Sequence, residues 1–426
     1  MIGKEIHRFA RELWPLNRSI TGDGVRETLR QIAVHLPKLS IKSVPSGTKV
    51  FDWTVPREWL VREAYIVTPS GKKICDFSKN NLHLLGYSIP TKKNISLDEL
   101  KKHLYTFPEQ PNAIPYHTSY YKGNWGFCLS QNEFDKLESG NYKVKIDSEL
   151  FNGELNYGEL IIPGKTKKEI FLSTYICHSS MANNELSGPT VVTYLSKWLE
   201  KLNHREFTYR IIFIPETIGS ITYLNFNHKE MKQNIVAGFN VTCVGDNRAY
   251  SYLPSRDGKT LSDNIAKHVL TWIDPNFVRY TWLDRGSDER QYCAPGIDLP
   301  IASIHRTKFA QYPEYHTSLD NLDDVVTAEG LNGGYWAIRK ALELIEKNKK
   351  FKVTVLGEPQ LGKRGLYPSV STKHMDKQVR LMTHFISLCD GNTPLLNIAE
   401  RLNVPAWDLY NMIDNLLSHN LIIEIK

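Results

Sequence analysis

From about residue 158 onward, short apolar runs alternate with stretches of helical periodicity. Alternation of this kind is typical of βαβ units, and it predicts a largely parallel sheet flanked by helices. The expected elements, in chain order, are strand Glu169–Ile176, helix Gly188–Leu202, strand Phe207–Ile214, a helix around Ser220–Phe226 and strand Asn234–Val241. The sequence therefore predicts an α/β domain.

The composition changes along the chain and predicts further domains, since 426 residues exceed what one core usually fills. Residues 1–40 have helical periodicity and are expected to join residues 155–358 in the α/β domain. Residues 41–154 alternate short β-prone runs with Pro, Gly and Asn, which predicts a small inserted all-β domain. After a Gly-, Pro- and Ser-rich linker that ends near Lys373, residues 374–426 predict a winged helix-turn-helix.

The distribution of charge indicates which partners the protein can bind, and the cysteines indicate the redox state of its compartment. The net charge of +7 comes from scattered Lys and Arg, which indicates a solvated surface and not a nucleic-acid patch. The expected recognition helix carries Asp408 and Asp414 and few basic residues, so DNA is disfavoured as a partner. Six widely spaced cysteines fit a reducing compartment. There is no signal-peptide core and no run long enough to cross a membrane, so we expect a soluble, cytoplasmic protein without a membrane partner.

Three ionisable side chains stand where an apolar run is expected to end and a loop to begin. They are His178, Glu216 and His316. In open α/β sheets, ligands and catalytic groups collect at the carboxyl ends of the strands. Two imidazoles and a carboxylate delivered there can form the shell of a hydrolytic zinc site. The sequence therefore predicts a metal site.

These residues also have structural interpretations. His178 could simply cap a helix or donate a hydrogen bond. Glu216 could form a salt bridge, because an unpaired carboxylate after an apolar strand is costly. Asp288 lies in a crowded charged segment, where an ion pair is an equal alternative to a catalytic role. His305 and Arg306 follow the expected strand Ile301–Ile304 and could line the same mouth.

Four motifs carry a resemblance to a known family. They are His178–Pro189, Pro215–Ser220, Ser287–Gly296 and Tyr312–Thr317. The chain resembles the aminopeptidase-like proteins found with bacterial surface-polysaccharide genes. Their central domain is similar to co-catalytic zinc aminopeptidases and glutaminyl cyclases. The resemblance spans the whole chain and implies a zinc-aminopeptidase-like sheet, an inserted β domain and a C-terminal winged helix.

The resemblance implies that several carboxylates of a two-metal site are missing. His178 matches the histidine of the family's His-x-Asp motif, while Ser180 replaces its aspartate. The bridging aspartate falls on Asn184, with Glu185 beside it as a substitute, and Thr242 replaces a further aspartate. Losing the anionic bridge between two dications favours one zinc ion per chain over two.

Other positions match the family and complete the expected site. Of the two adjacent glutamates of the family, the resemblance implies that one is replaced by Pro215 and the other is kept as Glu216. His316 matches the histidine of the second metal site, and Ser287–Asp288 matches a Ser-Asp pair near the metal. The expected metal ligands are His178, Glu185, Glu216 and His316. The candidate general bases are Glu216, Asp288 and Glu185, and the candidate pocket residues are Asn184, His305, Arg306 and Tyr315.

Three functions are compatible with these observations. The leading hypothesis is a zinc-dependent hydrolase of aminopeptidase type that cleaves a peptide or amide bond of a small substrate. The alternative is a catalytically degenerate aminopeptidase-like scaffold that binds a ligand or partner and is linked to surface polysaccharide biosynthesis. A transcription regulator that acts through the C-terminal module is disfavoured by its charge. A homo-oligomer is left open.

Overall fold

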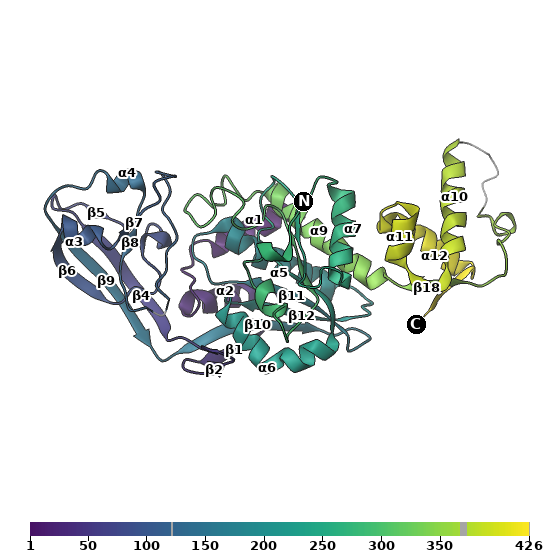
Figure 1. The fold of residues 1–426 in the computed structure, drawn as a ribbon, viewed down its shortest axis with the longest axis horizontal. Coiled ribbons are helices and arrows are strands. Elements are labelled where there is room, and N and C mark those ends of the chain that lie inside the picture. Colours follow the sequence, from purple (N-terminus) through teal and green to yellow (C-terminus); the bar gives the residue numbers. More distant parts are fainter. Residues whose placement is uncertain (121, 367–372, 426) are drawn as a thin grey trace. The chain divides into compact units, whose positions relative to one another are not determined.

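The computed structural model describes residues 1–120, 122–366 and 373–425 (Figure 1). The chain forms two compact units, the first comprising Met1–Asp263 and Phe277–Trp336 and the second Asn264–Asn276 and Ala337–Lys426. Residues 367–372 of the expected linker lie outside the described part.

The first unit contains an eight-stranded sheet. In spatial order its strands are β1 (Ser40–Pro45), β10 (Glu154–Ile162), β12 (Thr208–Ile214), β11 (Glu169–Tyr175), β13 (Ile235–Asn240), β16 (Ile301–His305), β14 (Ser251–Leu253) and β15 (Val278–Arg279). The central strands β12, β11, β13 and β16 pair in parallel, while β10 and β14 pair antiparallel to them on either side. The expected α/β class with a mainly parallel sheet is confirmed.

Helices bury both faces of the central strands. Every residue of β11 is buried, which explains why its sequence reads as a continuous run and not as an alternating one. The helices of the first unit are α1 (Ile2–Leu13), α2 (Asp23–His35), α5 (Ser187–Glu200), α6 (Ile218–Asn234) and α8 (Glu289–Tyr292). Most of α7 (Leu261–Ile273) belongs to the second unit, while α9 (Ala328–Lys347) begins in the first unit and ends in the second. Helix α6 is longer than expected at both ends, because its polar C-terminal half lacks an apolar pattern that would reveal it.

The order of the strands reverses at β11. The chain leaves β11, passes through α5 to β12 on one side, and then returns through α6 to β13 on the other side of β11. A crevice outside the carboxyl ends of the strands is expected at such a reversal. This is where the residues after β11 and β12 come together.

The inserted segment has a sheet of its own. Its four strands lie in the order β5 (Lys73–Ile74), β4 (Glu58–Val67), β9 (Asn141–Phe151) and β6 (Thr91–Ser96). Two small pairs, β2 (Lys49–Val50) with β3 (Trp53–Thr54) and β7 (Leu104–Tyr105) with β8 (Phe127–Cys128), and the short helices α3 (Leu97–Lys101) and α4 (Gln131–Phe134) complete it. The expected β-rich insertion is present.

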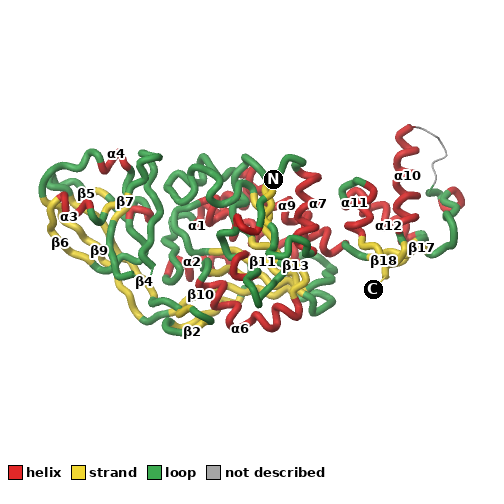
Figure 2. The backbone as a smooth tube through the Cα atoms, in the orientation of Figure 1, coloured by secondary structure: helices red, strands yellow, loops and turns green. Residues whose placement is uncertain are grey.

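The second unit contains the expected winged helix (Figure 2). Its elements are β17 (Lys350–Val353), α10 (Lys373–Leu388), β18 (Asp390–Pro394), α11 (Leu395–Leu402), α12 (Tyr410–Ser418) and β19 (Ile422–Ile425). The strands form a small sheet in the order β18-β17-β19, so the C-terminal wing strand pairs with β17.

The cysteines and the hydropathy of the helices are two further features of the described chain. All six cysteines lie in the described part of the chain, and each is buried and free. Among the described residues, no helix is long and apolar enough to cross a membrane.

Candidate functional site

His178 lies in the loop directly after β11, and its imidazole is almost completely buried. Its Nδ1 atom lies 2.9 Å from Oε2 of Glu185, which belongs to the single π-helical turn Ala182–Leu186 before α5. The backbone carbonyl of His178 accepts a hydrogen bond of 2.9 Å from Nε of Arg18. Contacts on two sides therefore fix both the position and the orientation of the ring.

Glu216 lies directly after β12 and faces the other nitrogen of the same imidazole. Its Oε2 is 3.8 Å from Nε2 of His178, and burial raises the pKa of the Glu216 carboxyl. The next residue, Thr217, has a backbone φ of +62°, which is strained for a β-branched residue. The Thr217 N–H donates to Oδ1 of Asp288 at 2.8 Å, and this bond holds the strained turn.

His316 reaches the site from a loop and not from a strand end, which corrects the expectation from the sequence. The preceding strand, β16, ends at His305. His316 has a φ of +57°, and its carbonyl accepts a 2.9 Å hydrogen bond from the Tyr116 N–H of the inserted segment. Its ring centroid lies 5.6 Å from that of His178. Burial, and then the charge of His178, lower the pKa of His316 to about 3, so its imidazole is neutral at physiological pH.

Asn184 and Thr242, the positions at which the resemblance led us to expect missing carboxylates, are neutral side chains held by hydrogen bonds. The hydroxyl of Tyr175 donates to Oδ1 of Asn184 at 3.0 Å and lies 2.5 Å from Oγ1 of Thr242. Nδ2 of Asn184 lies 3.5 Å from Nε2 of His316. Asn184 and Thr242 are thus held by Tyr175 and bring no negative charge to the site.

A cavity of about 380 Å³ lies next to His178 and Glu216. Its lining consists of Ile20, Trp53, Tyr120, Cys177, His178, Glu216, Thr217, Ile218 and Arg290. His178 and Glu216 therefore face a space large enough for part of a small substrate.

Among the described residues, one set of three side chains brings its ligand atoms within metal-binding spacing, and a second set lies beside it without meeting that spacing. In the first, Sγ of Cys177, a ring nitrogen of His178 and a carboxylate oxygen of Glu185 lie within 4.8 Å of one another. In the second, Nε2 of His178 faces Glu216, and His316 lies nearby. The first set fits poorly, because burial raises the pKa of the Cys177 thiol to about 11 and its sulfur already accepts the Glu216 N–H.

The second set agrees better with the chemistry of zinc. Nε2 of His178 and Oε2 of Glu216 lie 3.8 Å apart. This is close to the distance of about 3.3 Å between two ligand atoms in a tetrahedral zinc site. Glu185 then acts on Nδ1 of His178, as the carboxylate partners of metal-bound histidines commonly do. Glu185 therefore fits a positioning role better than the ligand role expected from the sequence.

Three other candidates lie around this centre. Asp288 is buried, accepts from the Thr217 N–H and the Ser220 hydroxyl, and has a pKa raised to about 8 by burial and by the charge of Glu216. Tyr315 stacks on the His316 ring at 3.9 Å between centroids. Asn184 is buried, and its Nδ2 lies 3.5 Å from Nε2 of His316. Asp288 thus contacts the residue next to Glu216, while Tyr315 and Asn184 contact His316.

His305 and Arg306 do not appear among the described residues that line this cavity. Nδ1 of His305 lies 2.8 Å from the Thr242 carbonyl, so that it donates there from a buried position. The Arg306 guanidinium donates to the Ala249 carbonyl and to Asn247. Both side chains make structural contacts in the loop region after β13.

Sequence reasoning missed several residues of the site. Arg18, fully buried, approaches Oε1 of Glu185 to 3.7 Å, and it comes from the turn-rich loop between α1 and α2. An arginine in a turn-rich loop is ordinarily exposed, so its sequence context gives no signal of this buried contact. Tyr116 packs its ring 5.3 Å from His178 and 5.2 Å from His316. Its place in an irregular part of the insertion gives no local signal.

Comparisons with known proteins agree with this architecture. A domain of unknown function, DUF4910, matches residues 7–348, and a winged helix-turn-helix family matches residues 349–424. A Clostridium acetobutylicum protein, provisionally named a polysaccharide biosynthesis protein with aminopeptidase-like domain, is 44% identical over 401 residues, which are 93% of this chain and 91% of that protein.

Solved structures show the same relationship. The crystal structure of a provisionally assigned peptidase from Clostridium acetobutylicum matches with a TM-score of 0.93 and 41% identity, covering 100% of this chain and 97% of the other. A zinc aminopeptidase from Bacillus subtilis shares the fold, with a TM-score of 0.58 and 14% identity over 80% of this chain and 94% of the other. The chain therefore belongs to the DUF4910 family of aminopeptidase-like proteins with a C-terminal winged helix-turn-helix.

Proposed function

We propose that this protein is a hydrolase that uses one zinc ion to cleave an amide bond of a small substrate. The observation that carries the proposal is the pair of His178 Nε2 and Glu216 Oε2, which lie 3.8 Å apart and belong to residues that line the cavity. His316 is the third ligand in this proposal, because its imidazole is neutral and lies beside His178. This set leaves room for water and substrate, as catalytic zinc sites require.

A bound zinc ion would polarise the amide carbonyl and lower the pKa of its water. The side chains of the protein supply the remaining functions. Glu185 orients His178 through Nδ1 and thereby keeps Nε2 directed at the cavity. Asp288 is the proposed positioning group for Glu216, since it is buried and accepts the N–H of the neighbouring Thr217. It acts next to Glu216 through the turn at Thr217.

The charges in the site support one metal ion and not two. Arg18 lies against Glu185, and both side chains are fully buried, so part of the negative charge near His178 is already compensated. Asn184 and Thr242 are neutral and satisfied by Tyr175. A second dication in this place would have no anionic bridge to the first.

The proposal is tested by measuring zinc stoichiometry and affinity on the purified full chain. We expect about one equivalent of zinc per chain. The variants Glu216→Ala and His316→Ala should each lose zinc retention while keeping the fold, because Glu216 lines the cavity and His316 lies in a loop with its ring beside that of His178. His204→Ala, which removes an exposed histidine, serves as the control. Undiminished zinc affinity in His316→Ala would remove His316 from the shell.

A specific observation also favours a second candidate, an aminopeptidase-like scaffold that binds a ligand without hydrolysing it. The Tyr175 hydroxyl forms hydrogen bonds with Asn184 and Thr242, which stand where carboxylates were expected. These buried polar groups therefore have partners without a metal ion, so the site can be stable without one. The name of the Clostridium acetobutylicum relative would connect such a role to polysaccharide biosynthesis. Ligand binding by the zinc-free protein, with no turnover after zinc is added, would favour this candidate over the hydrolase.

A further inference from the structure

Aromatic side chains of the inserted segment form one wall of the cavity. Trp53 of strand β3 and Tyr120 both line it, although 39% of the Trp53 surface and 44% of the Tyr120 surface remain exposed. The lining also includes the polar pair His178 and Glu216. Large aromatic side chains that stay partly exposed at a cavity offer flat apolar faces to a ligand.

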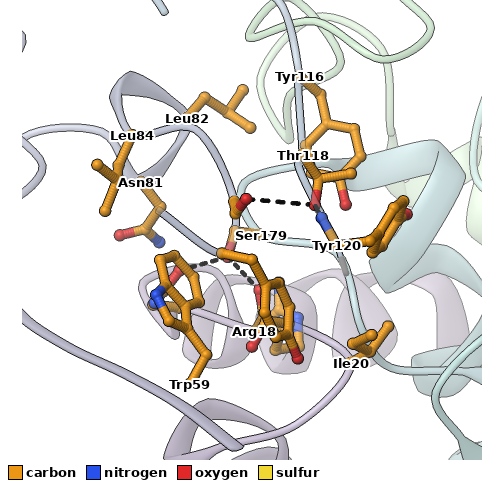
Figure 3. A pocket seen from close by; sticks show the side chains of 14 residues that line it. Arg18, Ile20, Trp59, Asn81, Leu82, Leu84, Tyr116, Thr118, Tyr120 and Ser179 are labelled. Atoms are coloured by element: carbon orange, nitrogen blue, oxygen red, sulfur yellow. Dashed lines mark hydrogen bonds between the residues drawn. The ribbon is translucent and has the colours of Figure 1, made fainter. Parts of the chain in front are cut away.

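A smaller cleft continues this wall, and Figure 3 shows Trp59, Tyr116 and Tyr120 around it. The cleft shares Ile20 and Tyr120 with the larger cavity. Trp59 stacks on Tyr87 at 5.2 Å between ring centroids, and the Tyr87 ring lies 6.5 Å from that of Tyr120, which lines both spaces.

The free space in the smaller cleft is about 30 Å³, which suits a substituent and not a whole ring. Polar side chains accompany the aromatic ones there, namely Asn17, Asn81 and Thr118. Flat apolar faces interleaved with amides and hydroxyls match a ligand that has apolar ring faces and polar edges. A pyranose ring has both.

The charge of the larger cavity argues against a free amino terminus as the ligand. Among the described residues that line it, Glu216 is the one carboxylate, and it faces His178. Arg290 is also part of the lining. An ammonium group would meet this guanidinium and find no spare carboxylate, which disfavours it. A neutral acylamino group meets no such repulsion.

We propose that the cavity binds an N-acylated amino sugar, whose pyranose ring lies on Trp53 and Tyr120 with its acylamino group toward His178 and Glu216. This inference rests on the proposed hydrolase function and names its substrate class. The reaction consumes one water: the carbonyl–nitrogen bond breaks, the hydroxyl goes to the acyl carbon to give a carboxylic acid, and a proton goes to the nitrogen to give the free amine. No oxidant or further reactant is needed.

Binding and turnover are measured separately on the zinc-loaded full chain. N-acetylglucosamine and its short oligomers are compared with leucine amide and with an N-acetylated dipeptide amide, by calorimetry for binding and by acetate or amine release for turnover. We expect the sugars to bind best, and Trp53→Ala to weaken their binding about tenfold. Tyr120→Ala is a second variant that should weaken it in the same direction.

Trp272→Ala is the matched control, since Trp272 is similarly exposed, at 37%, and does not line the cavity. It should change sugar affinity less than about twofold. Sugar binding that depends on Trp53 supports the inference even without acetate release, in which case the hydrolase proposal alone fails. Tighter binding or faster cleavage of either peptide probe overturns the inference and leaves the hydrolase proposal standing. Absence of binding by every sugar probe also overturns it.

Discussion

Nδ1 of His178 lies 2.9 Å from Oε2 of Glu185, and this contact decides which nitrogen of the imidazole faces the cavity. Glu185 is buried, and the other side of its carboxylate approaches Arg18. Of the atoms that the structure describes, Oε1 of Glu185 and Nη2 of Arg18 are buried without a hydrogen-bond partner. The carboxylate thus links the orientation of a proposed metal ligand to a buried ion pair.

Glu185→Gln should weaken zinc binding and destabilise the protein together. Without the carboxylate, His178 loses its orienting partner, and we expect zinc affinity to fall about 10- to 100-fold. Arg18 loses its buried counter-charge, which should lower the free energy of unfolding by about 3 kcal/mol. Zinc titration and urea unfolding measure the two effects. The control is Glu149→Gln, because Glu149 forms an exposed ion pair with Arg62. This variant should leave both the zinc affinity and the free energy of unfolding nearly unchanged.

Asn184→Asp should have opposite effects in the presence and absence of metal. A carboxylate at this buried position faces Nε2 of His316, so without metal it lacks a donor there and lowers stability by about 1–3 kcal/mol. With zinc, the added negative charge should raise metal affinity at least about tenfold. Thermal unfolding of the variant and the wild type, each with and without zinc, tests the loss of stability in the zinc-free form and the gain in the zinc-loaded form. Equal zinc affinity in the variant and the wild type would show that Asn184 does not face the metal.

Protonation of His305 should destabilise the fold in mild acid. Burial, and then the charge of Lys308, lower the pKa of His305 to about 4, below the ordinary value near 6.5, although the hydrogen bond from its Nδ1 to the Thr242 carbonyl raises it. Its Nε2 is buried without a hydrogen-bond partner in the described part of the chain. The folded state therefore binds fewer protons than the unfolded state, and the stability contributed above pH 6.5 is lost as the pH falls toward 4.

The measurement is urea unfolding of the wild type and His305→Gln at pH 8 and pH 5. The variant retains a donor for the Thr242 carbonyl but does not titrate. We expect the wild type to lose about 2 kcal/mol more than the variant between the two pH values. A difference that does not change with pH would mean that His305 already carries a proton at pH 8 or is exposed to solvent.

Asp320→Asn should loosen the segment that precedes α5. The buried Asp320 carboxylate accepts the backbone N–H groups of Asn183 at 2.7 Å and Asn184 at 3.0 Å. An amide offers only one oxygen, so one buried N–H loses its acceptor, which should cost about 1–3 kcal/mol at pH 8. Amide hydrogen exchange of Asn183 and Asn184 should become faster. Asp324→Asn, on an exposed neighbour in the same loop, should leave both measurements nearly unchanged.

The sequence by itself determined the α/β class, the β-rich insertion, the winged helix and the placement of His178 and Glu216 after strands β11 and β12. These features are local, since periodicity and the length of an apolar run decide them. The tertiary structure alone decided that Glu185 turns toward the imidazole, and that Arg18 and Tyr116 complete the site. Such contacts join loops that are far apart in the chain, and their geometry depends on how the sheet and the insertion pack, which no local pattern encodes.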